Sequence, residues 1–284
     1  MAAAKVNLAL EILGKRDDGY HELATVFQAV DLSDRLVIED AAALELRTSD
    51  PALPTDETNL ALRAGIMLSR AAGVERGARI TLDKRIPVAA GLGGGSADAA
   101  AVLIGLNRLW RLHWPVARLA EVGAGLGMDV PFFLYGGAAR ATGRGERLER
   151  VDGFSFAIVL VNPGFGISTA EAYRAVTPAL YTDGRRARQM AVDVRTGSRA
   201  GVARGLYNAL EAAVAPRHPE IARMKAALVA AGALGAEMSG SGATVFGIAR
   251  SLEHARQIQS RVQRGSWSVW AVRALRGPAV RMRS

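Results

Sequence analysis

The sequence of 284 residues contains no cysteine and only four histidines. The lack of cysteine excludes disulfides, thiolate nucleophiles and cysteine-ligated metals, and four scattered histidines disfavour a zinc site. Charges or glycines interrupt every apolar run before it reaches the roughly 18 residues that a membrane span needs. Any catalysis by this chain must therefore use Lys, Asp, Ser, Thr or backbone groups.

The N-terminal segment also lacks the features of a cleavable signal peptide. Lys5, Asn7 and Glu11 interrupt its first apolar stretch, so we expect a cytoplasmic protein without a membrane partner. Half of the residues are apolar, and the chain exceeds the length that one hydrophobic core usually fills. We therefore expect two lobes, with an active site in the cleft between them.

Negative charge is scarce in the second half of the chain. The formal net charge is +9, and the excess lies beyond residue 150, where arginines are spread from Arg174 to Arg283 without a compact run. Such scattering is typical of a solvated basic surface. An anionic substrate is the next interpretation, and a nucleic-acid-binding module is a rival of another class that leaves the motifs described below unexplained.

Apolar periodicity and turn residues predict a mixed α+β chain rather than a regular series of βαβ units. In the first half we expect strands at 5–12, 35–38 and 78–82, and helices at 60–71, 99–109 and 116–122. In the second half we expect strands at 156–161, 244–248 and 267–272, and helices at 221–228 and 252–264. These patterns favour two domains, 1–150 and 151–284. The polar, arginine-rich segment 183–199 is predicted to be a mobile loop.

A cluster of glycines in front of a predicted helix is the most specific feature. In Pro87-Val-Ala-Ala-Gly-Leu-Gly-Gly-Gly-Ser96, four glycines occupy five positions, so the backbone can curl and present several N–H groups to one anion. The helix that follows adds its positive end. A tight strand-to-helix turn is the alternative, but it requires only one or two glycines. We therefore predict a phosphate-binding loop.

Two common phosphate-binding motifs do not fit this loop. A Walker loop has Lys followed by Ser or Thr after its last glycine, whereas Ser96-Ala97-Asp98 stands here. A dinucleotide-binding fingerprint would place its third glycine at Ser96 and would lie within a parallel βαβ series.

Instead, the segment Pro87–Ala101 resembles the phosphate-binding motif of the GHMP kinases, a family that includes galactokinase, homoserine kinase, mevalonate kinase and phosphomevalonate kinase. Lys5-Val-Asn-Leu8 and Met238-Ser-Gly-Ser-Gly-Ala-Thr244 are similar to two other motifs of that family and occur in the expected order. The resemblance implies a two-lobed α+β GHMP kinase fold and MgATP as the phosphoryl donor.

Further segments resemble the branch of this family that phosphorylates the 2-hydroxyl of a cytidine-diphosphate-linked polyol, 4-diphosphocytidyl-2-C-methylerythritol. They are Gly19-Tyr-His-Glu-Leu23, Leu106-Asn-Arg-Leu-Trp110 and Leu126-Gly-Met-Asp-Val-Pro131. The chain departs from the pattern at Ala3 and Met128, away from the chemistry. Other GHMP kinases, which act on homoserine or mevalonate derivatives, are the nearest rivals, and a weak homodimer stays open.

The resemblance assigns catalytic roles to Asp129, as the base, and to Lys5, as its partner. From the residues alone, a helix N-cap ahead of Val130-Pro131 is slightly favoured for Asp129, and Lys5 could lie at a strand edge with its amine in solvent. The resemblance implies that ATP is bound by Pro87, Gly91, Leu92, Gly93, Gly94, Gly95, Ser96 and Ala97. The Ser96 hydroxyl is also a candidate Mg²⁺ ligand, with a helix cap as its alternative.

The substrate-binding residues are expected in four segments. Asn7 lies on the same strand face as Lys5 by the two-residue period. The resemblance assigns Tyr20 and His21 to the cytidine and makes Tyr173 a candidate stacking ring, although Tyr173 could also be a core residue. It adds Thr169 as a substrate contact and a second glycine loop with Gly240 and Ser241, for which a tight turn is the alternative.

Overall fold

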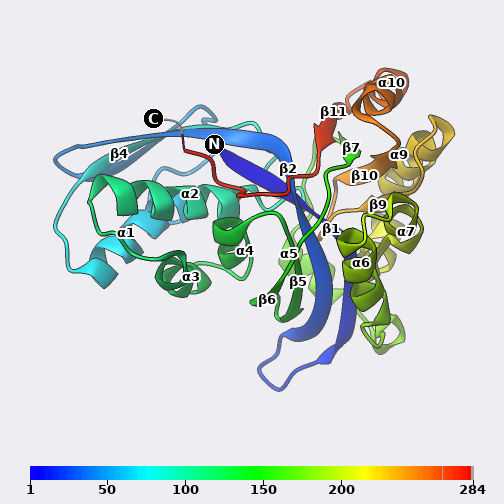
Figure 1. The fold of residues 1–284 in the computed structure, drawn as a ribbon, viewed down its shortest axis with the longest axis horizontal. Helices are drawn as coiled ribbons and strands as arrows, with labels where there is room; N and C mark the ends of the chain where they lie inside the picture. Colours follow the sequence, from blue (N-terminus) through cyan, green and yellow to red (C-terminus); the bar gives the residue numbers. More distant parts are fainter. Residues whose placement is uncertain (264, 283–284) are drawn as a thin grey trace.

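The computed structural model describes residues 1–263 and 265–282, which form two lobes on either side of a long N-terminal hairpin (Figure 1). The strands are β1 Ala2–Lys15, β2 His21–Glu39, β3 Leu44–Thr48, β4 Ala78–Asp83, β5 Ala138–Gly143, β6 Arg147–Val151, β7 Ala157–Asn162, β8 Tyr207–Asn208, β9 Ala236–Met238, β10 Val245–Ala249 and β11 Ser268–Arg273. The helices are α1 Leu60–Ala72, α2 Gly94–Leu109, α3 Val116–Ala124, α4 Val130–Tyr135, α5 Thr169–Arg174, α6 Arg185–Arg195, α7 Arg199–Gly205, α8 Ala209–Val214, α9 Pro219–Ala230 and α10 Leu252–Val262, with short 3₁₀ turns at Pro178–Leu180 and Ala215–Arg217. The predicted two-lobed α+β architecture is confirmed.

The hairpin of β1 and β2 organises the larger, seven-stranded sheet. Its main path runs β3-β4-β2-β1-β8, and β5 and β6 continue from β2. The far end of β2 pairs with β4, while its near end pairs with β5. Most of β1 is buried, because α2 packs against the strand and α6 and α8 also contact it. A charged side chain on this strand is therefore held inside the protein.

The second sheet is antiparallel and has the order β11-β7-β10-β9. Helices α9 and α10 pack on it and bury an apolar core around Ile221, Met224, Leu228 and Ile258. After β11 the chain returns to the first lobe, where Leu275 N–H donates to the Ala29 carbonyl. Near the end of this segment, the Arg281 N–H donates to the Met1 carbonyl at 2.9 Å, so the last described residues lie beside the N-terminus. The division at residue 150 stays a prediction.

Most predicted elements are present, with bounds that differ by several residues. The expected strand 35–38 is only the end of β2, and the helix expected at 99–109 begins earlier, at Gly94. The expected helix 252–264 ends at Val262, and residue 264 lies outside the described residues. None of the helices in the described ranges is long and apolar enough to cross a membrane.

The predicted mobile loop at 183–199 is wrong, because α6 occupies most of it. Ala187, Met190, Ala191 and Val194 recur at helical spacing and are buried. The buried carboxylate of Glu11 accepts the Ala187 N–H near the start of the helix at 2.8 Å. Exposed arginines between these small apolar residues lower the mean hydropathy and conceal the period.

Candidate active site

One large cavity, of about 1130 Å³, opens between the hairpin, the glycine loop and α5. Two predicted residues do not line it, since Leu92 and Ala97 are buried. The Leu92 carbonyl accepts the Lys5 N–H at 3.0 Å and thereby ties the loop to β1. The predicted residues that line the cavity are Lys5, Asn7, Tyr20, His21, Pro87, Gly91, Gly93, Gly94, Gly95, Ser96, Asp129, Thr169, Tyr173, Gly240 and Ser241.

The first glycine loop, Gly91–Gly95, curls because two of its glycines have left-handed backbone. The φ angles are +76° at Gly91 and +70° at Gly93. Gly93 is the N-cap of α2 and supplies no side-chain cap, so the N–H groups of the first turn are left for an anion. Ser96 lies inside this turn, and its alternative reading as the helix cap is wrong.

The second glycine loop, Ser239–Gly242, closes directly against the first. The Ser239 hydroxyl donates to the Gly91 carbonyl at 2.9 Å, and the Thr244 N–H donates to the Ala90 carbonyl at 3.3 Å. A Cβ atom at Gly91 would lie 1.9 Å from the Ser239 carbonyl oxygen. Gly91 is therefore required by close backbone approach as well as by its φ angle.

The Lys5 side chain is buried where the two loops meet, so the alternative with its amine in solvent is wrong. Its Nζ donates to Asn7 Oδ1 at 2.7 Å and to the Gly91 carbonyl at 2.9 Å, and lies 3.9 Å from Asp129 Oδ2. The contact with Asn7 confirms that these two residues share a strand face. Burial lowers the pKa of Lys5, and the nearby charge of Asp129 offsets part of that effect.

Asp129 stands at the N-cap position of α4, yet its side chain makes no capping hydrogen bond. Its carboxylate is about one third exposed and lines the cavity. Asp129 is therefore the N-cap residue by its backbone position, as the alternative reading predicted, but its carboxylate does not cap the helix. A carboxylate that is not used in capping is available to orient a hydroxyl group and to accept its proton.

Aromatic side chains surround another part of the cavity. The rings of His21 and Tyr173 stack with 5.6 Å between centroids and 26° between planes, and Tyr181 meets His21 edge-on. Tyr20 is 56% exposed. Burial, and then the charge of Lys15, lower the pKa of His21, so its ring is neutral near pH 7 and can both donate and accept.

Tyr173 packs against the core of the second lobe and also lines the cavity. Burial raises the pKa of its phenol, and the negative charge of Asp129 raises it further. Thr169, the first residue of the same helix, hydrogen-bonds to Ser241 through their hydroxyls at 3.2 Å. A Cβ atom at Gly240 would lie 3.2 Å from Lys5 Nζ. The fold thus brings the segments of Tyr20, Asp129, Thr169 and Gly240 to one cavity.

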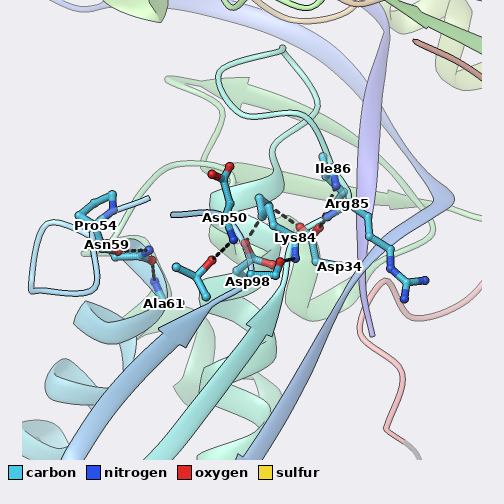
Figure 2. A network of polar contacts seen from close by, with 11 residues as sticks. Asp34, Asp50, Pro54, Asn59, Ala61, Lys84, Arg85, Ile86 and Asp98 are labelled. Atoms are coloured by element: carbon cyan, nitrogen blue, oxygen red, sulfur yellow. Dashed lines mark hydrogen bonds and ion pairs between the residues drawn. The ribbon is translucent and has the colours of Figure 1, made fainter. Parts of the chain in front are cut away.

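A buried network ties the first glycine loop to the sheet (Figure 2). Lys84 Nζ lies 2.9 Å from Asp98 Oδ2 and also contacts Asp34, whose other oxygen accepts the N–H groups of Arg85 and Ile86. No described residue partners Asp98 Oδ1. Burial raises the pKa of Asp98 to about 7; the charge of Asp34 adds to this effect and the charge of Lys84 opposes it. Because Asp98 belongs to α2, the network fixes the helix that carries the loop.

The residues that the sequence analysis missed are charged groups around the cavity. Asp98 carries a visible signal, because a single carboxylate among alanines in an apolar helix needs a buried cation. Lys84 follows directly after a strand, and Arg144 lies between two glycines in a turn, but neither pattern indicates a site by itself. The missed residues that line the cavity include Lys15, Lys84, Asp98, Arg144 and Arg174.

Backbone N–H groups at a helix start, together with a lysine–aspartate pair in the same cavity, suit the transfer of a phosphoryl group to a small molecule. Catalysis of that reaction depends mostly on positioning and on compensation of charge. The fold and this site define the protein as a small-molecule kinase.

Comparison with known proteins identifies the family. The GHMP kinases N terminal domain matches residues 59–137, and the GHMP kinases C terminal domain matches residues 190–266. The chain is 49% identical over 267 residues to a 4-diphosphocytidyl-2-C-methyl-D-erythritol kinase of Pelotomaculum thermopropionicum, covering 93% of each chain. It is 44% identical to an enzyme of that name from Gloeobacter violaceus, over 90% of this chain and 87% of the relative.

Solved structures agree. A crystal structure of 4-(cytidine 5'-diphospho)-2C-methyl-D-erythritol kinase superposes with a TM-score of 0.82 and 38% identity, covering 96% of this chain and 97% of the other. A homoserine kinase from Cytophaga hutchinsonii shares the fold at 20% identity, with a TM-score of 0.73 and coverage of 98% and 96%. The chain belongs to the GHMP kinase family, and it accordingly uses ATP and acts on a small-molecule substrate.

Proposed function

We propose that the protein transfers the γ-phosphoryl group of MgATP to the 2-hydroxyl of 4-diphosphocytidyl-2-C-methyl-D-erythritol, a step of the non-mevalonate isoprenoid pathway. The names of its relatives support this substrate. The observation that carries the proposal is that the Lys5–Asp129 pair, the two glycine loops and the His21–Tyr173 stack line one cavity. Donor and acceptor can therefore meet at the pair.

The donor phosphates are proposed to bind the N–H groups of Gly91–Ser96 at the start of α2. These groups are already oriented by the backbone, so they stabilise negative charge without rearrangement during transfer. Pro87 lines the same part of the cavity, and the buried Leu92 and Ala97 anchor the loop in the apolar core. In this segment only Ser96 is proposed to act through its side chain; the other residues contribute backbone groups or packing.

Mg²⁺ fits the oxygen groups of this region. The Ser96 hydroxyl lies 4.0 Å from the point that a Cβ atom of Gly127 would occupy, so it points toward the segment that carries Asp129. Protein sites for Mg²⁺ in kinases offer one or two oxygen ligands and leave the rest to phosphates and water. We propose Ser96 as such a ligand. A bound Mg²⁺ would neutralise part of the triphosphate charge.

The acceptor hydroxyl is proposed to lie between Asp129 and Lys5. The Asp129 carboxylate orients the hydroxyl and accepts its proton as the new P–O bond forms. The Lys5 ammonium is held by Asn7 and the Gly91 carbonyl, and it stabilises negative charge on the reacting oxygens. Because the lysine is buried and prepositioned, its charge acts more strongly than it would in water.

The cytosine of the acceptor is proposed to bind at Tyr20, His21 and Tyr173. A neutral imidazole can donate to and accept from the polar edge of the base, while the tyrosine rings offer stacking faces. Asn7, Thr169 and the second loop, with Gly240 and Ser241, line the cavity between this end and the glycine loop. They are proposed to contact the polyol and its phosphates.

The proposal extends to location and partners. Both substrates are water-soluble nucleotides of the cell interior, which supports a cytoplasmic enzyme without a membrane or nucleic-acid partner. A weak homodimer also stays a prediction, and size-exclusion chromatography with light scattering at several protein concentrations would test it.

A turnover assay tests the reaction and the substrate together. Purified protein with MgATP and the cytidine-linked alcohol should release ADP and the phosphorylated product in equal amounts, and homoserine or mevalonate should not replace the acceptor. Asp129→Asn should lower kcat by about 10²–10⁴-fold. Asp152→Asn, at an exposed carboxylate outside the cavity, is the matched control. Faster turnover of homoserine or mevalonate, or near-normal turnover by Asp129→Asn, would contradict the proposal.

A further inference from the structure

We propose that Arg144, in the turn between β5 and β6, is a specificity-determining residue that binds the diphosphate of the cytidine-linked acceptor. This inference rests on the proposed function and adds a residue outside the motifs from which the site was predicted. Its basis is the place of the guanidinium in the cavity, its charge and the rigidity of the turn that holds it.

The turn directs Arg144 toward the nucleobase end of the cavity. Its flanking glycines have left-handed backbone, with φ +74° at Gly143 and +110° at Gly145, which allows a tight reversal that carries one long side chain. The guanidinium carbon of Arg144 lies 4.9 Å from the centroid of the Tyr20 ring. Both residues line the cavity. A guanidinium stacks well on an aromatic face, and this contact restricts its orientation.

The same turn also approaches the reacting end of the cavity. A Cβ atom at Gly145 would lie 4.0 Å from the Cβ of Met128, the residue before Asp129. The turn that carries Arg144 therefore approaches Tyr20 on one side and the segment of Asp129 on the other. In the acceptor, the diphosphate likewise lies between the cytidine and the polyol that carries the reacting hydroxyl. The order of groups along the cavity matches the order of groups along the substrate.

The charge of Arg144 is not neutralised by an ion pair. Across residues 1–263 and 265–282, no carboxylate oxygen lies within 4.0 Å of its guanidinium nitrogens. The charge of Asp18 acts on Arg144 from further away, but Asp18 is paired with Arg16 at 3.1 Å. By contrast, Arg140 on the same hairpin pairs with Glu149 at 3.1 Å. Among the described residues, Arg144 thus presents to the cavity a cation that forms no ion pair.

Two glutamates fix the position of this turn before any substrate arrives. The Glu146 carboxylate accepts the Arg144 N–H at 2.6 Å. Glu22 accepts the Gly143 N–H at 3.1 Å and also binds Arg16 at 2.5 Å, so it joins this turn to the neighbouring turn that carries Tyr20. These bonds fix the backbone of the turn, and the Tyr20 ring restricts the planar guanidinium, which can bind two phosphate oxygens at once. Preorganisation of this kind lowers the cost of ordering side chains on binding.

The test compares Arg144→Met and Arg144→Lys with Arg147→Met, a matched control at an exposed arginine of the same hairpin that does not line the cavity. For Arg144→Met we expect KM for the acceptor to rise by about 10–100-fold, while kcat and KM for ATP stay within about twofold. Arg144→Lys should fall between wild type and Arg144→Met, because it keeps the charge and loses the planar fork. Arg147→Met should resemble wild type.

Binding of cytidine diphosphate and of cytidine, measured by calorimetry, separates recognition of the phosphates from support of Tyr20. Arg144→Met should weaken cytidine diphosphate by about the same factor as KM and cytidine by less than about threefold. Equal weakening of the two ligands, no change in either, or the same effect in Arg147→Met would overturn the proposal. If the wild-type protein does not phosphorylate the acceptor, the proposed function fails, whereas the two binding measurements still decide the role of Arg144.

Discussion

The two glycine loops that meet at Lys5 are supported by similar charge arrangements in different surroundings. Beside the first loop, Lys84 lies between Asp34 and Asp98. Beside the second, Lys225 lies between two glutamates, at 2.6 Å from Glu211 and 3.1 Å from Glu237. In both networks one ammonium serves two carboxylates, so one carboxylate of each network tends to keep its proton.

The networks differ in their contact with water. The side chains of the first are at most 7% exposed, whereas those of the second are 10–26% exposed. An ion pair in dry surroundings is costly to break, because the remaining charge cannot be hydrated, while a wetter pair loses little. The comparison indicates that the loop proposed to hold the triphosphate rests on a more rigid base than the loop proposed to contact the acceptor.

The largest expected effect comes from breaking the contact between the two loops. In Gly91→Ala, the new Cβ would collide with the Ser239 carbonyl oxygen, and the residue would keep an unfavourable φ of +76°. We expect the free energy of unfolding, measured in urea, to fall by about 4–6 kcal/mol. Gly95→Ala is the matched control, since its Cβ would meet only Leu60 at 3.4 Å. Similar losses in the two variants would contradict this account.

Removal of each lysine measures the difference between the two networks directly. Lys84→Met leaves two buried carboxylates without a cation and should lower the free energy of unfolding by about 3 kcal/mol. Lys225→Met acts in partly hydrated surroundings and should cost about 1 kcal/mol. Combining Lys84→Met with Asp98→Asn should restore part of the loss. Equal costs for the two lysines, measured by urea unfolding at pH 7, would show that burial does not set the difference.

The pH dependence of stability tests the protonation state of Asp98 specifically. The pKa of Asp98 is raised from 3.8 to about 7, so the folded state keeps a proton that the unfolded state releases in this range. Its contribution to stability is therefore complete below about pH 3.8 and is lost as the pH rises toward 7. Asp98→Asn should flatten the dependence between pH 4 and 7 by on the order of 2 kcal/mol.

The contribution of the second network to stability should also fall as the pH rises, but over a range that extends to a higher pH. Burial raises the pKa of Glu237 to about 8, so Glu237→Gln should remove a loss of stability that extends to that pH. Thermal or urea unfolding of both variants across pH 4–9 would distinguish the windows. A wild-type stability that, relative to the variant, rises with pH through either window would contradict the assigned protonation states.

Much of the fold and of the proposed site could be predicted from local patterns. Alternation along the first strand placed Lys5 and Asn7 on one face, which their hydrogen bond confirms. The glycine-rich stretch predicted a loop that runs into a helix, and the helix expected at 60–71 is α1, which Gly73 ends in the left-handed conformation that glycine readily adopts. These signals succeed because backbone propensity acts within a few residues.

Other features depended on contacts between distant segments. The helix α6 is stabilised by burial of small apolar residues against the sheet and by Glu11, so its own arginine-rich composition was misleading. The Asp34–Lys84–Asp98 network joins residues that are 50 and 14 positions apart. Nothing in a short window of the sequence indicates which lysine a buried aspartate will meet.

By itself, the sequence determined much of the chemistry available to this protein: no thiol, a glycine loop for an anion, and motifs that resemble one kinase family. Only the tertiary structure decided how these parts meet. Helix α2 packs against both β1 and α4, and Lys5 of β1 lies 3.9 Å from Asp129 at the start of α4. The pairing of β2 with β5 brings the turn that carries Arg144 beside the turn that carries Tyr20. Such contacts form when the elements pack to bury their apolar faces, and long-range packing leaves no periodic trace in the chain.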